Sequence, residues 1–158
     1  MKIGVFISLI ITFLYSCKTD NSESIPVQNA TTQAFQTDSI KSEIYACMQF
    51  QEDAWNSYQL EDFMSCYWEN DSLCFIGKSG LNRGWQKTLD NYKKSYPDTA
   101  AMGHLKFENI EFLPLSPAHA YVIGKWSLFR VEDTLSGHYS LLWQKKQEGW
   151  KIIADHSS

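Results

Sequence analysis

The chain has 158 residues, with 18 acidic and 14 basic side chains and a formal net charge of −4 at pH 7. This charge balance argues against nucleic acid as a partner, because phosphate backbones are bound by clustered Lys and Arg side chains. The length suits a single domain with short additional segments.

The N-terminal segment has the pattern of a targeting signal. Lys2 precedes an apolar run from Ile3 to Tyr15, which is shorter than the roughly 18 residues that a membrane-spanning helix needs. The "LYSC" that closes the run resembles the lipobox of bacterial lipoproteins, although Tyr15 stands where a small residue is usual. The resemblance implies that residues 1–16 are a signal peptide and that lipid on Cys17 anchors the protein to a bacterial membrane of the cell envelope, with the outer membrane as the expected one. An ordinary secretory signal with an incidental cysteine is the alternative.

Residues 17–38 are polar and contain few large apolar side chains. Such a segment cannot bury enough apolar surface to offset the entropy lost on ordering. We therefore expect a lipidated flexible tether over residues 17–38 and a folded domain over residues 39–158.

The domain contains three cysteines, Cys47, Cys66 and Cys74. An odd number allows one disulfide at most, and the spacing matches no zinc pattern. Because unpaired cysteine is among the most buried residue types, we interpret these three as core residues.

Three helices are expected before the main run of strands. Apolar side chains recur at three- and four-residue steps from Ser39 to Tyr58, which predicts a helix with one buried face, capped by Asp38 or Ser39. "QLEDFMSCYW" indicates a second, short helix, and "DSLCFIG" a strand that stops at "GKSG". A third helix should run from near Gly84 and end before Pro97, whose ring disfavours helix at the preceding residue.

The rest of the chain alternates with a period of two. Strands are predicted at about 102–115, 118–132, 136–147 and 149–157. Short breaks between long consecutive strands are typical of an antiparallel meander. The expected class is therefore α+β, with a twisted sheet that curls over the helices and leaves an open cone.

Four segments, "AWNSYQLEDFMSCYWENDSLCFIG", "GLNRGWQKTLDNYKKSYPD", "LSPAHAYVIGKWSL" and "GWKIIADHSS", resemble the nuclear transport factor 2-like superfamily. Within it, the similarity is to the polyketide cyclase-like and kinase association domain-like branch. The resemblance implies a cone-shaped curved antiparallel sheet wrapped over three N-terminal helices, a mostly apolar pocket, and frequent homodimers formed through the outer sheet face. The superfamily includes enzymes, carriers and scaffolds, so the activity has to be argued from the site.

The last strand carries adjacent Asp155 and His156. In a regular strand they point to opposite faces, so they make a poor acid–base pair unless a β-bulge re-aims one of them. The face with Trp150, Ile152 and His156 is the more apolar. We therefore expect His156 inside the cone and Asp155 at the outer face or rim. His156 is either a candidate general base or a core histidine with a hydrogen-bond partner.

Candidate ligand contacts combine aromatic rings with a few polar groups, as small-molecule pockets do. Gln51 interrupts the apolar stripe of the first helix, so its amide needs a partner: an internal group, a water or a ligand. The predicted ligand-binding residues are Gln51, Trp55, Tyr58, Tyr67, Phe75, Trp85, Trp126 and His156.

No motif in the sequence indicates a metal site, a cofactor or a nucleophilic triad, and His104, His119, His138 and His156 are scattered singly. The family's isomerases imply a carboxylate base on the sheet and a tyrosine on the first helix. Tyr45 and Tyr58 offer the tyrosine, but no acidic residue is assigned as the base.

Three functions remain open. The favoured one is a lipid-anchored domain whose pocket binds a small, mostly apolar or aromatic molecule. The alternatives are an isomerase or cyclase with His156 as general base, and a homodimeric interaction domain without catalysis.

Overall fold

The computed structural model describes residues 27–158, with side chains from residue 36 onward. The predicted signal peptide and Cys17 lie outside this range. Among the described residues, no helix combines the length and the apolarity needed to cross a bilayer.

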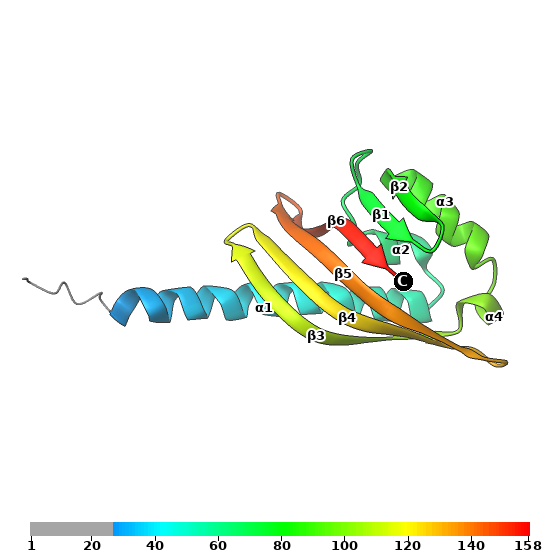
Figure 1. Ribbon diagram of the computed structural model, residues 1–158, viewed down its shortest axis with the longest axis horizontal. Coiled ribbons are helices and arrows are strands. Elements are labelled where there is room, and N and C mark those ends of the chain that lie inside the picture. The colour runs from blue at the N-terminus through cyan, green and yellow to red at the C-terminus, as the bar shows by residue number, and fades with distance from the viewer. Residues whose placement is uncertain (1–26) are drawn as a thin grey trace, which may run out of the picture.

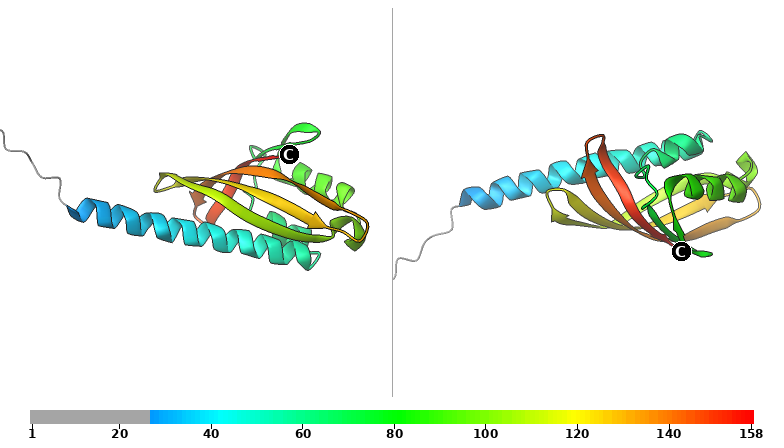
Figure 2. Two further views of the ribbon diagram at one scale, coloured as in Figure 1. Left: turned by 60° about the horizontal axis from the view of Figure 1, so that its bottom comes forward. Right: turned by 90° about the horizontal axis from the view of Figure 1, so that it is seen from above.

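Helix α1 (Val27–Asn56) runs along one side of the sheet (Figures 1 and 2). Its buried face carries Ile44, Met48, Gln51 and Trp55, as the sequence periodicity predicts. The predicted start at residue 38 or 39 is wrong, because the helix begins at Val27 and both proposed caps lie inside it. The polar composition of residues 27–38 obscures this extension, since no apolar stripe marks those turns.

The other helices and the first strands form one end of the molecule (Figure 1). They are α2 (Leu60–Met64), β1 (Cys74–Gly77), β2 (Gly80–Arg83), α3 (Trp85–Ser95) and α4 (Thr99–Met102). Helix α3 begins after Gly84 and ends before Pro97, as predicted. Strand β2 was not predicted, because it begins at the last glycine of "GKSG" and its four residues show no clear alternation.

A long meander completes the sheet: β3 (His104–Ser116), β4 (His119–Phe129), β5 (Thr134–Lys146) and β6 (Gly149–Ser157). The strand order is β2-β1-β6-β5-β4-β3. The predicted antiparallel pairing holds everywhere except between β1 and β6, which are parallel. A parallel pair needs a long connection, and most of the domain lies between β1 and β6 in the sequence.

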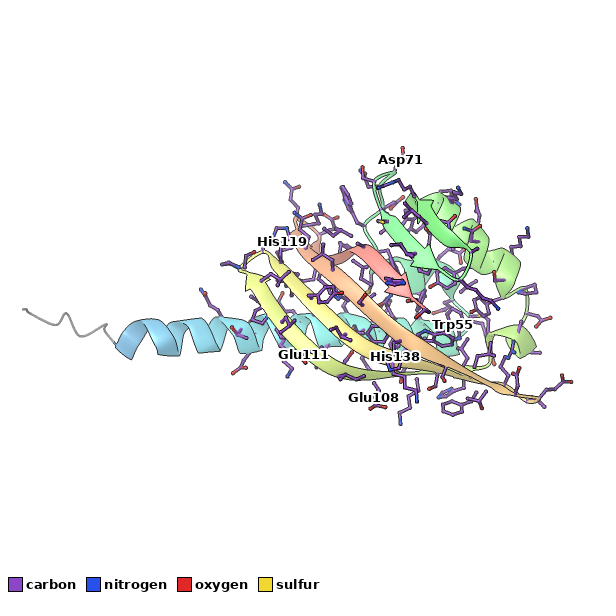
Figure 3. All side chains as sticks on the ribbon, viewed as in Figure 1. Trp55, Asp71, Glu108, Glu111, His119 and His138 are labelled. Carbon is purple, nitrogen blue, oxygen red and sulfur yellow. A yellow bond between two sulfur atoms is a disulfide. The ribbon has the colours of Figure 1, made fainter. Side chains whose placement is uncertain are left out.

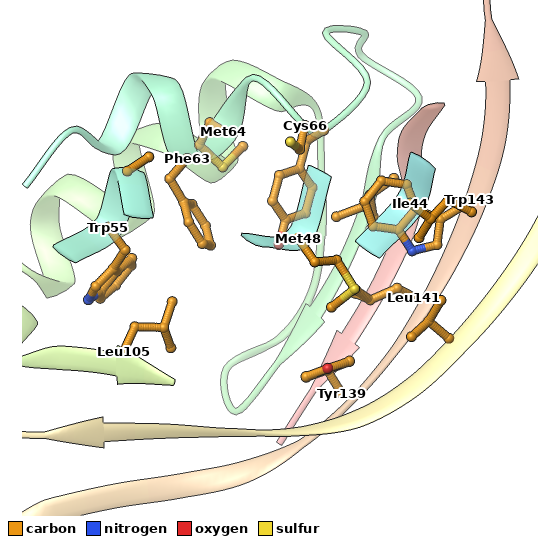
Figure 4. Packing of buried hydrophobic residues seen from close by; sticks show 14 of the residues in the cluster. Ile44, Met48, Trp55, Phe63, Met64, Cys66, Leu105, Tyr139, Leu141 and Trp143 are labelled. Atoms are coloured by element: carbon orange, nitrogen blue, oxygen red, sulfur yellow. The ribbon is translucent and has the colours of Figure 1, made fainter. Parts of the chain in front are cut away.

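The core fills the space between the helices and the concave face of the sheet. Figure 4 shows it running from Trp55 and Leu105 at one end to Ile44 and Trp143 at the other. Cys47 on α1 and Cys66 after α2 form a disulfide. The interpretation of these two cysteines as simple core residues is therefore wrong, whereas Cys74 is unpaired.

Candidate functional site

A cavity of about 510 Å³ opens between the concave face of the sheet, the C-terminal half of α1, and α3. Its volume lies in the range typical of small-molecule sites. The inner wall is mostly aromatic and aliphatic, whereas the mouth carries small polar side chains. The inner group is Gln51, Trp55, Phe63, Tyr67, Phe75, Tyr92, Tyr96, Leu105, Phe107, Trp126, Leu128, Tyr139, Leu141 and Asp155, and exposed mouth residues include Lys78, Ser79, Asn91, Ser95 and Ser136.

A β-bulge in β6 decides which side chains of this strand face the cavity. Leu142 pairs with Ala154 and Trp143 pairs with Ile152, so Ile153 is the extra residue of β6. An extra residue reverses the inward–outward alternation beyond it. Ile152 is therefore buried before the bulge and Asp155 is buried after it.

The bulge places Asp155 inside and His156 outside. Asp155 is 3% exposed and lines the cavity, whereas His156 is exposed and is not part of the cavity wall. The predicted positions of these two residues are therefore wrong. The run Ile152–Ile153–Ala154, in which apolar residues do not alternate with polar ones, was the only signal of this break in the sequence.

Asp155 is the acceptor of a buried hydrogen-bond network. The Tyr67 hydroxyl donates to Asp155 Oδ2 at 2.7 Å, and the Ser157 hydroxyl donates to Oδ1 at 2.6 Å. Burial raises the pKa of Asp155 to about 6, although both hydrogen bonds and the nearby His156 favour the ionised form. A carboxyl group with such a pKa can gain or release a proton near neutral pH.

Two tyrosines beside Asp155 keep their hydroxyl protons. Burial raises the pKa of Tyr67 well above its usual range, and the negative charge of Asp155 raises it further. Burial and Asp155 also raise the pKa of Tyr92. Both hydroxyls therefore serve as neutral hydrogen-bond donors at the inner end of the cavity.

Five predicted contact residues, Gln51, Trp55, Tyr67, Phe75 and Trp126, line the cavity. The Gln51 amide has an internal partner, because its Nε2 donates to the carbonyl of Phe63 at 3.2 Å. The indole N–H of Trp55 donates to the carbonyl of Met102, so its ring rather than its polar edge is offered to the cavity.

Tyr58, Trp85 and His156 do not line the cavity, which corrects the sequence prediction. Tyr58 follows the end of α1 with a φ of 62° and is 52% exposed. Trp85 packs against α2 instead, where its indole N–H donates to the carbonyl of Met64. Helical spacing would turn the Tyr58 side chain inward only if α1 continued through residue 58. Helix α1 ends at Asn56, two residues earlier.

Tyr45, the other candidate tyrosine, packs edge-to-face on Phe112 outside the cavity wall. The wall residues that lie outside the predicted ligand-binding set include Asp155, Tyr92 and Tyr139. Tyr92 lies on the predicted apolar side of α3, and its approach to Asp155 depends on how α3 docks on the sheet.

Within the described part of the chain, no three His, Cys, Asp or Glu side chains come together as a possible metal site. Figure 3 shows His119 near the β3–β4 hairpin and His138 well along β5. The register of β4 and β5 also separates the two histidines, since His119 lies opposite Gln144 and His138 lies opposite Lys125.

The same architecture occurs in solved bacterial proteins. A nuclear transport factor 2-like protein of unknown function from Shewanella oneidensis is 41% identical, with a TM-score of 0.72, over 75% of this chain and 98% of the other. The chain belongs to the nuclear transport factor 2-like family.

More distant structures share the fold of this nuclear transport factor 2-like protein. A ketosteroid isomerase-like protein from Erwinia carotovora atroseptica is 16% identical over 74% of this chain and 93% of its own, with a TM-score of 0.57. A putative calcium/calmodulin-dependent protein kinase type II association domain from Thiobacillus denitrificans is 15% identical over 77% and 92%, with a TM-score of 0.58. No protein-family model and no curated protein sequence matches the chain.

Proposed function

We propose that this protein binds a small, mostly apolar or aromatic molecule in the cavity. The observation that carries the proposal is an aromatic-walled cavity of about 510 Å³ with one buried carboxyl network at its inner end. Apolar walls provide affinity by removing ligand surface from water, and a few fixed polar groups orient the ligand.

The binding proposal is tested by native mass spectrometry of the purified protein after incubation with a bacterial metabolite extract. We expect a small molecule bound to the wild type and lost from the variants Ser95→Trp and Ser136→Trp, which narrow the mouth from two sides. Val131→Trp is the control, because Val131 is exposed in the β4–β5 hairpin and does not line the cavity. A ligand-free homodimer would contradict binding and support the interaction-domain alternative.

A second candidate is an enzyme that moves a proton next to a carbonyl group. The pKa of Asp155, raised to about 6 beside two neutral tyrosine hydroxyls, favours it. In this scheme Asp155, and not His156, accepts the proton, while Tyr92 donates a hydrogen bond to the developing oxyanion, since the Tyr67 hydroxyl already donates to Asp155.

The enzymatic candidate is tested by hydrogen–deuterium exchange at the α-carbon of a panel of cyclic and aromatic ketones in D₂O. Protein-dependent exchange that disappears in Asp155→Asn, with ketone binding retained, would support it. If ketones bind but exchange only at the uncatalysed rate, the enzymatic candidate fails and only the binding proposal remains.

We also propose that the domain is held at the bacterial envelope through lipid on Cys17. The support is the "LYSC" pattern after an apolar segment. Two or three acyl chains would anchor the protein stably, since each buried CH₂ contributes about 0.8 kcal/mol.

A further inference from the structure

Two charged side chains, Asp155 and Lys78, contribute to the described cavity wall. Lys78 is exposed in the turn between β1 and β2, at the mouth. Asp155 is buried at the inner end. The electrostatic field that a ligand meets inside the cavity is therefore set mainly by a carboxylate.

Within the described chain, this carboxylate has no Lys or Arg partner among the ion pairs. Its two hydrogen-bond donors, the hydroxyls of Tyr67 and Ser157, are neutral. An ionised carboxylate offers about four acceptor positions, and these two hydrogen bonds fill two of them. Buried carboxylates are usually paired with a cation, which makes this site unusual.

The inner wall of the cavity consists largely of aromatic rings. Trp55 packs edge-to-face against Phe63, Tyr92 and Tyr96, and Tyr92 packs in the same way against Phe75. Aromatic faces carry negative partial charge and attract ammonium groups. A carboxylate at the end of a cavity with aromatic walls is the combination that binds organic cations.

We propose that the ligand is an organic cation, a protonated amine on an aromatic or alicyclic body, with its ammonium group against Asp155. This inference rests on the proposed binding function and adds the charge of the ligand. An anionic ligand would either bring its negative charge next to that of Asp155 or keep that charge at the mouth near Lys78. A neutral ligand would leave the carboxylate without a counter-charge.

The test compares three probes that share an indole ring: tryptamine, a cation; tryptophol, which is neutral; and indole-3-acetate, an anion. Calorimetry with the full-length protein should show tryptamine binding about tenfold or more tighter than either of the others. Asp155→Asn should remove most of this preference while tryptophol affinity stays within about threefold. Asp90→Asn, on the exposed side of α3, removes the same charge away from the cavity and should change nothing.

The pH dependence gives a second measurement that needs no variant. The groups facing Asp155 are the hydroxyls of Tyr67, Tyr92 and Tyr139, with His156 on the opposite side of the strand. The tyrosines stay neutral because burial raises the pKa of each. Tryptamine keeps its proton below pH 8, since alkyl amines titrate near pH 10. Its affinity should therefore fall as the pH drops through about 6 and Asp155 is protonated.

Three results would overturn the proposal of a cationic ligand. They are binding of tryptophol or indole-3-acetate as tight as that of tryptamine, unchanged tryptamine affinity in Asp155→Asn, and no binding of any of the three probes. A neutral or acidic metabolite recovered from the cavity by mass spectrometry would also overturn it. That last result would leave the proposed binding function intact, so the two proposals fail separately.

Discussion

Burial at the inner end of an aromatic cavity raises the pKa of the Asp155 carboxyl group. Moving a carboxylate out of water disfavours its charged form, and the two short hydrogen bonds from Tyr67 and Ser157 offset only part of this effect. The result is a pKa of about 6, compared with 3.8 for an exposed aspartate. The same burial makes Asp155 a cost to folding at neutral pH.

Asp155→Asn should remove the loss of stability that the wild type shows between acidic and neutral pH. Well below pH 3.8 the carboxyl is protonated in both the folded and the unfolded chain and contributes nothing. Between pH 4 and 6 the unfolded chain releases its proton first, so stability falls as the pH rises, by about 3 kcal/mol in total. Urea unfolding at pH 4 and pH 7 should show this decline in the wild type and lack it in the variant. An equal decline in both proteins would contradict the raised pKa.

Tyr67→Phe should raise the pKa of Asp155 further. The variant removes the hydroxyl that stabilises the ionised carboxylate and leaves the ring in place. The expected loss of stability at neutral pH is about 2 kcal/mol, as for hydrogen bonds to charged groups. A ¹³C NMR titration of the Asp155 carboxyl measures the shift. Tyr58→Phe is the control, because the exposed Tyr58 does not line the cavity.

The Tyr139 side chain occupies the space beside Gly124, so no larger residue fits at position 124. Gly124 on β4 lies opposite Tyr139 on β5, and a Cβ at this position would come within 2.5 Å of the Glu108 carbonyl and closer still to the Tyr139 hydroxyl. The Tyr139 hydroxyl donates to Asn109 Oδ1 at 2.7 Å. The glycine therefore lets β4 and β5 pair while Tyr139 reaches across to β3.

The disulfide between α1 and the segment after α2 supports the position of Tyr67. Cys66 directly precedes Tyr67, and its carbonyl accepts a hydrogen bond from the Ile152 N–H on β6. The covalent link and the backbone pairing thus hold the donor to Asp155 from two sides. Such a link suits an oxidising compartment, in agreement with the proposed location in the envelope.

Cys47→Ser should lower the free energy of unfolding by about 3 kcal/mol, because the bridge spans a sequence separation of 19 and restricts the unfolded chain. Urea denaturation measures the loss, and dithiothreitol should reproduce it in the wild type. Cys74→Ser is the matched control, since Cys74 is unpaired. Stability that is insensitive to reduction would show that the bridge does not contribute.

The shape of the whole molecule separates the start of α1 from the cavity mouth. Figure 1 shows the N-terminal turns of α1 beyond the edge of the sheet, at the end opposite to α3 and the β1–β2 hairpin. In the proposed anchoring, Cys17 precedes this end of α1, whereas the mouth residues Lys78, Ser95 and Ser136 belong to the other end of the domain.

Cys17→Ser should release the protein from the membrane fraction. Radiolabelled palmitate should be incorporated into the wild type and be absent from the variant, because the thiol that carries the lipid is missing. Cys74→Ser serves again as the control and should retain the label. Label that persists on the Cys17 variant would rule out the lipoprotein proposal.

Local patterns in the sequence were enough to predict α3, the buried face of α1 and the four-strand meander. Their periods of 3.6 and 2 arise within each segment, so they can be recognised without knowledge of its neighbours. Several wall residues, such as Trp55 and Trp126, were predicted for the same reason. The family resemblance then added the cone-shaped arrangement, which the structure and the Shewanella relative confirm.

Only the tertiary structure decided which carboxyl or imidazole faces the cavity. The bulge at Ile153 lies where β6 pairs with Trp143 before it and with Leu142 after it, and this register depends on β5, which the sequence of β6 does not contain. The cysteine pairing likewise depends on how α1 packs against α2. The sequence alone therefore determined most of the elements and their order, whereas contacts between distant segments determined the chemistry of the site.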